Sequence, residues 1–128
     1  MTDSPPERDR RWPRSVYGTG SEPDPRFSFA NERTFLAWIR TGLGFLAAGV
    51  AIAAVADLKP TIGAEAQLAA IVLVVCGLTC GIGGLTRWAR NERAMRLNRP
   101  LASSALLAVL TGGLILVAVI AAVVVGLR

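Results

Sequence analysis

Three long apolar runs constrain this chain more than any other feature of its sequence. They cover residues 35–56, 66–86 and 101–127, and Arg40 is the only charged residue within them. An α-helix crosses the hydrocarbon layer of a bilayer with about 20 apolar residues. We therefore expect an all-α integral membrane protein, with three transmembrane helices in one domain over residues 24–128.

The charge balance fits that prediction. The net charge is +5, and every basic residue except Lys59 is an arginine. In a soluble protein this balance would suggest nucleic acid as a partner. Here the arginines flank the apolar runs, where basic residues orient a membrane protein and contact anionic headgroups. We expect the lipid bilayer as a partner and no nucleic acid.

Residues 1–23 differ from the rest because they are polar and rich in proline and glycine. They offer few apolar side chains to bury, so we expect a disordered segment. No apolar stretch follows Met1, so no cleavable signal peptide is expected. Asp24 and Pro25 then form a typical helix start, with an N-cap aspartate followed by a proline at the first helical position.

The distribution of arginine predicts the topology. Nearly all arginines lie before the first run or between the second and third runs. The positive-inside rule then places the N-terminus inside and the C-terminus outside. We expect a multi-pass protein of the inner or plasma membrane.

Arg26, Arg33 and Arg40 are spaced seven residues apart. At 100° per residue they share one helix face, which leads from water into the membrane. Residues 41–56 alone span about 24 Å, which is less than the hydrocarbon thickness. Arg40 therefore lies below the headgroups, and it either extends up to them or faces the bundle interior.

The second apolar run contains Gly77 and Gly81 at the spacing that lets membrane helices approach closely. We expect a packing role for this pair, although glycine is abundant here. Cys76 and Cys80 are interpreted as small buried apolar residues. With two cysteines and no histidine, we expect no metal site and no cofactor.

An arginine-rich loop follows the second run, and Pro100 ends its helical pattern. Arg87, Arg90 and Arg93 recur every third residue, and Glu92 is spaced to pair with Arg96. An Asn-Glu-Arg triplet occurs twice, at residues 31–33 and 91–93. An acid flanked by arginines is more typical of an ion pair than of a proton shuttle. With no histidine and no nucleophile–base pair, we do not expect an enzyme.

The motif from Phe29 to Arg40 and the segment from Arg87 to Arg96 closely resemble the bacterial YidH family of inner-membrane proteins of unknown function. The resemblance runs from about Asp24 to the C-terminus. The same pattern resembles the membrane domain of the vacuolar transporter chaperone complex, which makes polyphosphate and moves it across a membrane. That resemblance implies a homo-oligomer, a pentamer around a pore, with basic residues at its mouth.

The match to the vacuolar proteins is partial. Asn31, Glu32 and Arg33 match the shared core, and Arg26 falls where those proteins carry a basic residue. Arg40 departs, because they have a neutral polar residue there. The sequence also contains no soluble polymerase domain, so polymer synthesis is not implied.

The sequence is compatible with two functions. The first is an oligomeric transport or channel subunit that handles an anionic, phosphate-like or polyanionic substrate at its cytoplasmic face. Its anion-binding or pore-lining residues would be Arg26, Arg33, Arg40, Arg87 and Arg90. The second is a structural or accessory membrane protein whose Asn-Glu-Arg motif acts as a helix-packing lock. Its ion pairs and hydrogen bonds would involve Asn31, Glu32, Glu92 and Arg93.

Overall fold

The computed structural model describes residues 9–59, 61 and 63–127. Four helices follow one another in the chain. They are α1 (Arg14–Tyr17), α2 (Pro25–Leu58), α3 (Ala64–Arg96) and α4 (Leu106–Gly126). The last three are long and apolar enough to cross a membrane, which confirms the predicted three-helix, all-α architecture.

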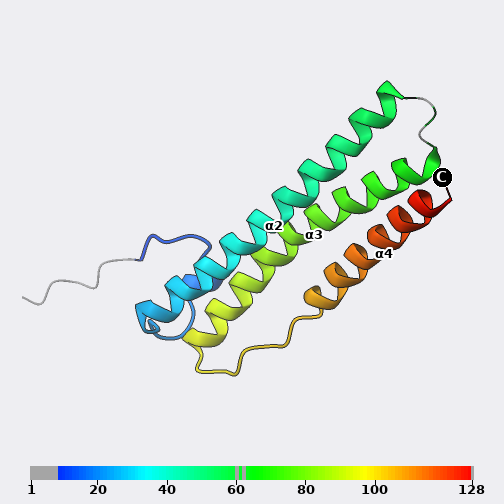
Figure 1. The fold of residues 1–128 in the computed structure, drawn as a ribbon. Coiled ribbons are helices and arrows are strands. Elements are labelled where there is room, and N and C mark those ends of the chain that lie inside the picture. The colour runs from blue at the N-terminus through cyan, green and yellow to red at the C-terminus, as the bar shows by residue number, and fades with distance from the viewer. Residues whose placement is uncertain (1–8, 60, 62, 128) are drawn as a thin grey trace, which may run out of the picture.

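The long helices lie in a row in the order α2, α3, α4 (Figure 1). α3 packs against both neighbours, whereas the backbones of α2 and α4 do not approach each other within the described residues. Most of the buried residues consequently belong to α3. The outer surfaces of α2 and α4 expose leucine, isoleucine and valine, as expected of helices that face lipid.

The predicted start of α2 is confirmed. The Asp24 carboxylate accepts a hydrogen bond of 2.9 Å from the backbone N–H of Arg26, and Pro25 is the first helical residue. This contact satisfies one of the N–H groups that a helix start leaves free. α2 then continues for 34 residues, about 51 Å at 1.5 Å per residue, which exceeds a bilayer core.

The third span begins later than the sequence suggested. We expected residues 101–127, but α4 covers Leu106–Gly126 and residues 101–105 belong to the connection from α3. Ser103 and Ser104 favour non-helical backbone, and the Leu106 side chain packs against Gly83 of α3. The 21 residues of α4 span about 32 Å, so α4 matches the hydrocarbon layer and needs no tilt.

Glycines bring α2 and α3 together. A Cβ at Gly77 would lie 2.9 Å from the Gly42 carbonyl oxygen and 2.6 Å from Leu46 Cγ, so neither position has room for a larger residue. Gly81, by contrast, faces open space. The predicted packing role is therefore correct for Gly77, which packs against Gly42 of α2, and wrong for Gly81.

Cys76 and Cys80 are buried free thiols, as expected. Together with Leu110 of α4 they form the core cluster of the helix row, and Trp38 and Phe45 of α2 pack against it. This cluster is small, because most of the large apolar side chains of the three helices are exposed on the outer surface of the helix row.

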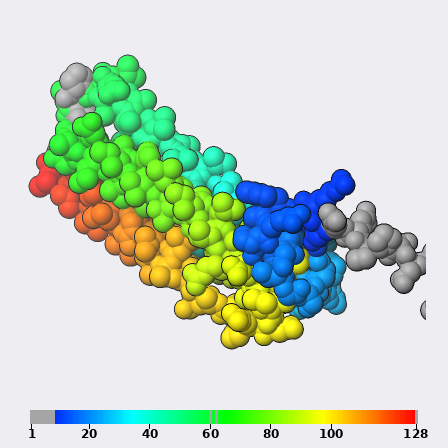
Figure 2. Space-filling model, turned by 180° about the vertical axis from the view of Figure 1, so that it is seen from behind, coloured from blue at the N-terminus to red at the C-terminus, as the bar shows by residue number. Residues whose placement is uncertain are grey.

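Residues 9–23, the N-terminal segment, run beside the end of α3 (Figure 2). This differs from the expectation of disorder over residues 1–23, of which residues 1–8 lie outside the described part. The segment contains α1, and Val16 within it is only 1% exposed. A few apolar residues suffice here because the rest of the segment is held by polar contacts.

We predict that replacement of Gly77 by Ala destabilises the protein by about 1 to 3 kcal/mol, because the added methyl group overpacks the α2–α3 contact. Gly81→Ala is the matched control on the same helix and should be neutral or slightly stabilising. Thermal unfolding in detergent measures both variants. Equal losses at the two positions would contradict the packing assignment.

Candidate functional site

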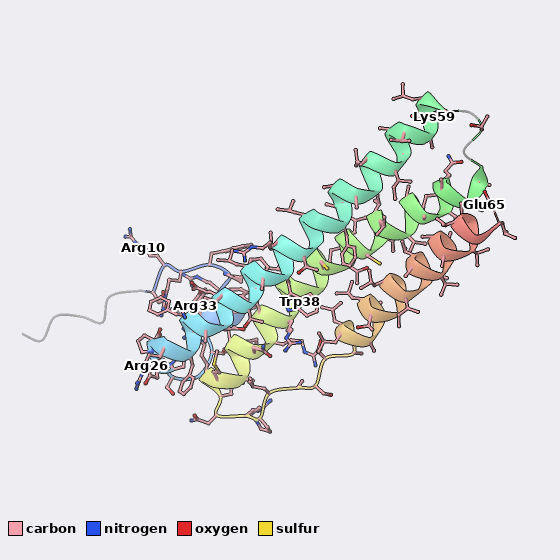
Figure 3. All side chains as sticks on the ribbon, viewed as in Figure 1. Arg10, Arg26, Arg33, Trp38, Lys59 and Glu65 are labelled. Carbon is pink, nitrogen blue, oxygen red and sulfur yellow. The ribbon has the colours of Figure 1, made fainter. Side chains whose placement is uncertain are left out.

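The polar residues gather at one end of the helix row, where α2 begins and α3 ends (Figure 3). We call this part, residues 25–38 of α2 and 84–96 of α3, the arginine-bearing end. Lys59 and Glu65 mark the opposite end. The site has two parts, a buried polar cluster between α2 and α3, and a pocket between α3 and α4.

Glu92 is the centre of the buried polar cluster and is only 2% exposed. Its carboxylate accepts hydrogen bonds from Ser28 Oγ at 2.8 Å and from Asn31 Nδ2 at 3.3 Å. Asn31 Nδ2 also donates to the Trp88 carbonyl at 3.0 Å, and Asn91 Nδ2 donates to Asn31 Oδ1 at 3.4 Å. These bonds fix the first turns of α2 against the last turns of α3.

Arg96 balances the charge of Glu92. It is 3% exposed, and its Nε lies 3.7 Å from Glu92 Oε1, which confirms the predicted pairing of these residues. Its Nη2 lies 3.3 Å from the carboxylate of Glu22, and its guanidinium lies 4.9 Å from the ring centroid of Tyr17. Arg96 therefore joins the cluster to the N-terminal segment.

The N-terminal segment closes over this end through further polar contacts. Arg11 bridges the carboxylates of Asp9 and Glu22, with a distance of 2.7 Å to each. Its hydrogen bonds lower the pKa of Glu22, and they lower the pKa of Asp9 from 3.8 to about 2. Gly20 has a φ of 62° and lies against the Arg96 carbonyl, so only glycine fits there without strain.

The triplet residues behave differently from one another. Asn31 and Glu92 are buried and form a hydrogen bond between α2 and α3, and Glu92 also lies beside Arg96. Glu32 and Arg93 are exposed and form no salt bridge among the described residues. The sequence pointed to the triplets but missed Ser28, Tyr17 and Glu22. The four-residue spacing of Glu92 and Arg96 was the one sequence pattern that pointed to the buried polar cluster.

The five arginines proposed to bind an anion are not brought together. Arg26, Arg33 and Arg40 are exposed. They lie about 180° around α2 from the residues that contact α3, such as Asn31 and Gly42. Arg40 consequently points away from the helix row, which agrees with the alternative in which it extends toward headgroups.

Arg87 and Arg90 share a pocket of about 340 Å³ between α3 and α4, the arginine pocket. Asn91 of α3 and Ser103 and Ser104 of the connection also line it. Nε and Nη1 of Arg87 are buried and have no hydrogen-bond partner among the described residues. The Arg87 guanidinium lies 5.9 Å from the ring centroid of Trp38, at a distance suited to a cation–π contact.

The N-terminus of α4 adds positive character to the arginine pocket. Ala105 occupies the N-cap position and supplies no side-chain cap, and Leu106 begins the helix at the pocket wall. The free N–H groups of a first helical turn carry partial positive charge. Chemically, the pocket combines two arginine side chains, a helix N-terminus and two hydroxyls, all of which bind anions.

The family model described as a domain of unknown function, DUF202, matches residues 26–94. The chain belongs to the DUF202 family. The match includes both Asn-Glu-Arg triplets and the two arginines of the pocket, whereas Arg96 and the α3–α4 connection lie beyond it.

Two relatives are similar over most of their length. The inner membrane protein YidH of Escherichia coli (strain K12) is 47% identical over 103 residues, which cover 79% of this chain and 87% of YidH. The uncharacterised protein Rv2272 of Mycobacterium tuberculosis (strain ATCC 25618 / H37Rv) is 45% identical over 103 residues, which cover 80% and 84%. No solved structure matches. The resemblance to YidH is confirmed, and this DUF202 protein is a multi-pass protein of the inner membrane.

We predict that Glu92→Gln destabilises this DUF202 protein by about 3 kcal/mol, because it removes the buried carboxylate beside Arg96 and leaves only the exposed Glu22 to pair with that guanidinium. Glu32→Gln is the control, since Glu32 is exposed and without a salt bridge in the described part of the chain. Thermal unfolding in detergent should separate the two variants. A Glu92→Gln protein as stable as the parent would refute the importance of the cluster.

Acid should release the N-terminal segment. The pKa values of Asp9 and Glu22 are lowered in the folded protein. Their contribution to the stability of the folded N-terminal segment is therefore fully present above their ordinary pKa values of 3.8 and 4.5. It is lost as the pH falls through the lowered values, toward about 2.

Tryptophan emission should report this release, because the ring centroids of Tyr17 and Trp88 are 6.2 Å apart. We expect the emission to change between about pH 4 and pH 2 in a non-ionic detergent. Glu22→Gln should show the altered emission already at neutral pH. Emission that stays constant down to pH 2 in the parent protein would contradict this account.

Proposed function

We propose that this DUF202 protein binds a phosphate-like anion in the arginine pocket, as a subunit of an oligomeric anion carrier or channel in the inner membrane. The observation that supports the proposal most directly is that Nε and Nη1 of Arg87 are buried and have no hydrogen-bond partner among the described residues. A buried N–H donor without an acceptor is costly to a folded protein. An anion in the pocket would supply acceptors once the Arg87 side chain turned toward it, so the pocket favours anionic occupants.

The form of the pocket favours phosphate among anions. Arg87 offers a planar fork of N–H donors that matches the oxygens of a phosphate group. Arg90 supplies a second positive charge, and the first turn of α4 supplies backbone N–H groups. The pocket volume of about 340 Å³ lies within the usual range for small ligands and suits one or two phosphate groups.

The transport part of the proposal requires several copies, since a row of three helices encloses no channel within the described residues. Arg26, Arg33 and Arg40 form an exposed stripe that another copy could face. The resemblance of the Asn-Glu-Arg motif to the membrane part of the vacuolar transporter chaperone complex also supports an oligomer that handles a polyanion. A pentamer is the form that this resemblance suggests.

A second function is favoured by the buried cluster around Glu92. In this alternative the protein is a structural or accessory component, and its polar residues serve to hold α2 against α3. The two functions differ in what a substitution at the arginine pocket does. Loss of Arg87 would affect anion affinity in the first, and stability alone in the second.

We predict that Arg87→Gln lowers the affinity for pyrophosphate at least tenfold, because charged hydrogen bonds of this kind contribute about 1.5 to 3 kcal/mol. Isothermal titration in phosphatidylcholine nanodiscs measures the affinity. Arg93→Gln is the matched control, because Arg93 is exposed and does not line the pocket. Arg87→Lys should recover only part of the affinity, since lysine lacks the planar fork.

Equal losses for Arg87→Gln and Arg93→Gln would indicate nonspecific charge attraction and would count against the pocket. The transport step is tested separately in proteoliposomes. Arg33→Gln and Arg40→Gln should lower anion flux while cross-linking shows that assembly is retained. Unchanged flux in the double variant would remove the exposed stripe from the proposal.

A further inference from the structure

A second pocket lies on the other side of α3, and its chemistry is opposite to that of the arginine pocket. Its volume is about 550 Å³, and we call it the aromatic pocket. The N-terminal segment, α2 and α3 all contribute to its wall. The residues on which the argument depends are Trp12, Glu32, Phe35, Leu36, Leu85 and Trp88.

The wall of the aromatic pocket combines aromatic rings with one carboxylate. Trp12, Phe35 and Trp88 supply the rings, and Glu32 is the only charged residue among those that line it. Glu32 forms no salt bridge and no side-chain hydrogen bond among the described residues. In a protein of net charge +5, this is an acidic and apolar spot.

No arginine forms a salt bridge with Glu32 among the described residues, and this includes Arg93, which lies one turn along α3 from Ala89 of the pocket wall. Arg33 follows it in the chain and therefore projects about 100° away around α2. Arg87 and Arg90 belong to the arginine pocket on another face of α3. Arg11 of the N-terminal segment is already paired with Asp9 and Glu22. The carboxylate of Glu32 is thus available to a ligand.

We propose that the aromatic pocket binds a lipophilic organic cation, such as an amine, quaternary ammonium or phosphonium ion with hydrophobic substituents. The Glu32 carboxylate opposes the charge, and the faces of aromatic rings attract cations at distances up to about 6 Å. The apolar substituents contact Leu36 and Leu85. This inference is independent of the anion proposal, because the charged residues of the two pockets differ.

Access and depth also favour an amphiphilic cation. Leu36 and Leu85 are exposed on the lipid-facing surface, and Trp12 is 85% exposed, so the pocket opens both to the bilayer and to its interface. A neutral acyl chain could fill the apolar part, but it would cover the Glu32 carboxylate without offering a partner, which is unfavourable. A cation with apolar substituents satisfies both parts of the wall.

The test uses tetraphenylphosphonium as the probe and the intact protein in phosphatidylcholine nanodiscs. Equilibrium dialysis, corrected with protein-free nanodiscs, should show saturable binding. Glu32→Gln should lower the affinity about tenfold, and Trp12→Leu should lower it several-fold. Glu65→Gln is the control, because it removes an exposed acid at the opposite end and should leave the affinity unchanged.

A second control uses tetraphenylborate, which has the same shape and the opposite charge. Its binding should not fall in Glu32→Gln. Glu32 is exposed, so the variant should unfold at the parent temperature, which separates loss of affinity from loss of fold. Arg87→Gln should still bind tetraphenylphosphonium, so failure of the anion proposal would leave this result intact.

Three outcomes would overturn the proposal. The first is binding of tetraphenylphosphonium no greater than that of protein-free nanodiscs. The second is equal affinity in the parent and in Glu32→Gln. The third is an absence of cation binding combined with strong quenching of protein fluorescence by brominated lipid chains. If Trp12→Leu abolished that quenching, the pocket would be assigned to an acyl chain.

Discussion

A carboxylate buried between two helices holds this fold together at its polar end. Glu92 is removed from water, and its negative charge is tolerable only because Ser28, Asn31 and Arg96 lie around it. These contacts restrict the rotation and the height of α2 relative to α3, and the close contact of Gly42 with Gly77 belongs to the same alignment.

In that alignment, different faces of α3 make different contacts. One face meets α2 through glycines and the polar cluster, and another meets α4 at Gly83 and Cys76. The arginine pocket lies beside the α4 contact, and the aromatic pocket lies beside the N-terminal segment. Because α3 separates the two pockets, a basic and an acidic environment coexist within a few helical turns without neutralising each other.

Much of the architecture was predictable because hydropathy over about 20 residues is a strong signal. The Asp24–Pro25 start and the Glu92–Arg96 pair were predictable because both depend on contacts local in sequence. The partners of Gly77 and Asn31 were not, since they lie on another helix and depend on its rotation. The structured path of residues 9–23 was missed because it depends on Arg96, which is more than 70 residues away.

The unequal lengths of the helices have a consequence for depth in the membrane. Of the three long helices, only α4 has a length that matches the hydrocarbon thickness. Its first residue, Leu106, packs against Gly83 of α3, and the next residue of α3, Gly84, contacts Trp38 of α2. The remainder of α3 beyond Gly83 extends about 20 Å farther. An α4 that fills the hydrocarbon layer would place Arg87 close to the boundary between lipid and water, and Glu92 and Arg96 on the water side of it. α4 is the shortest of the three long helices, so a change in bilayer thickness would move the rim of the arginine pocket relative to the headgroups before it affected the buried ion pair.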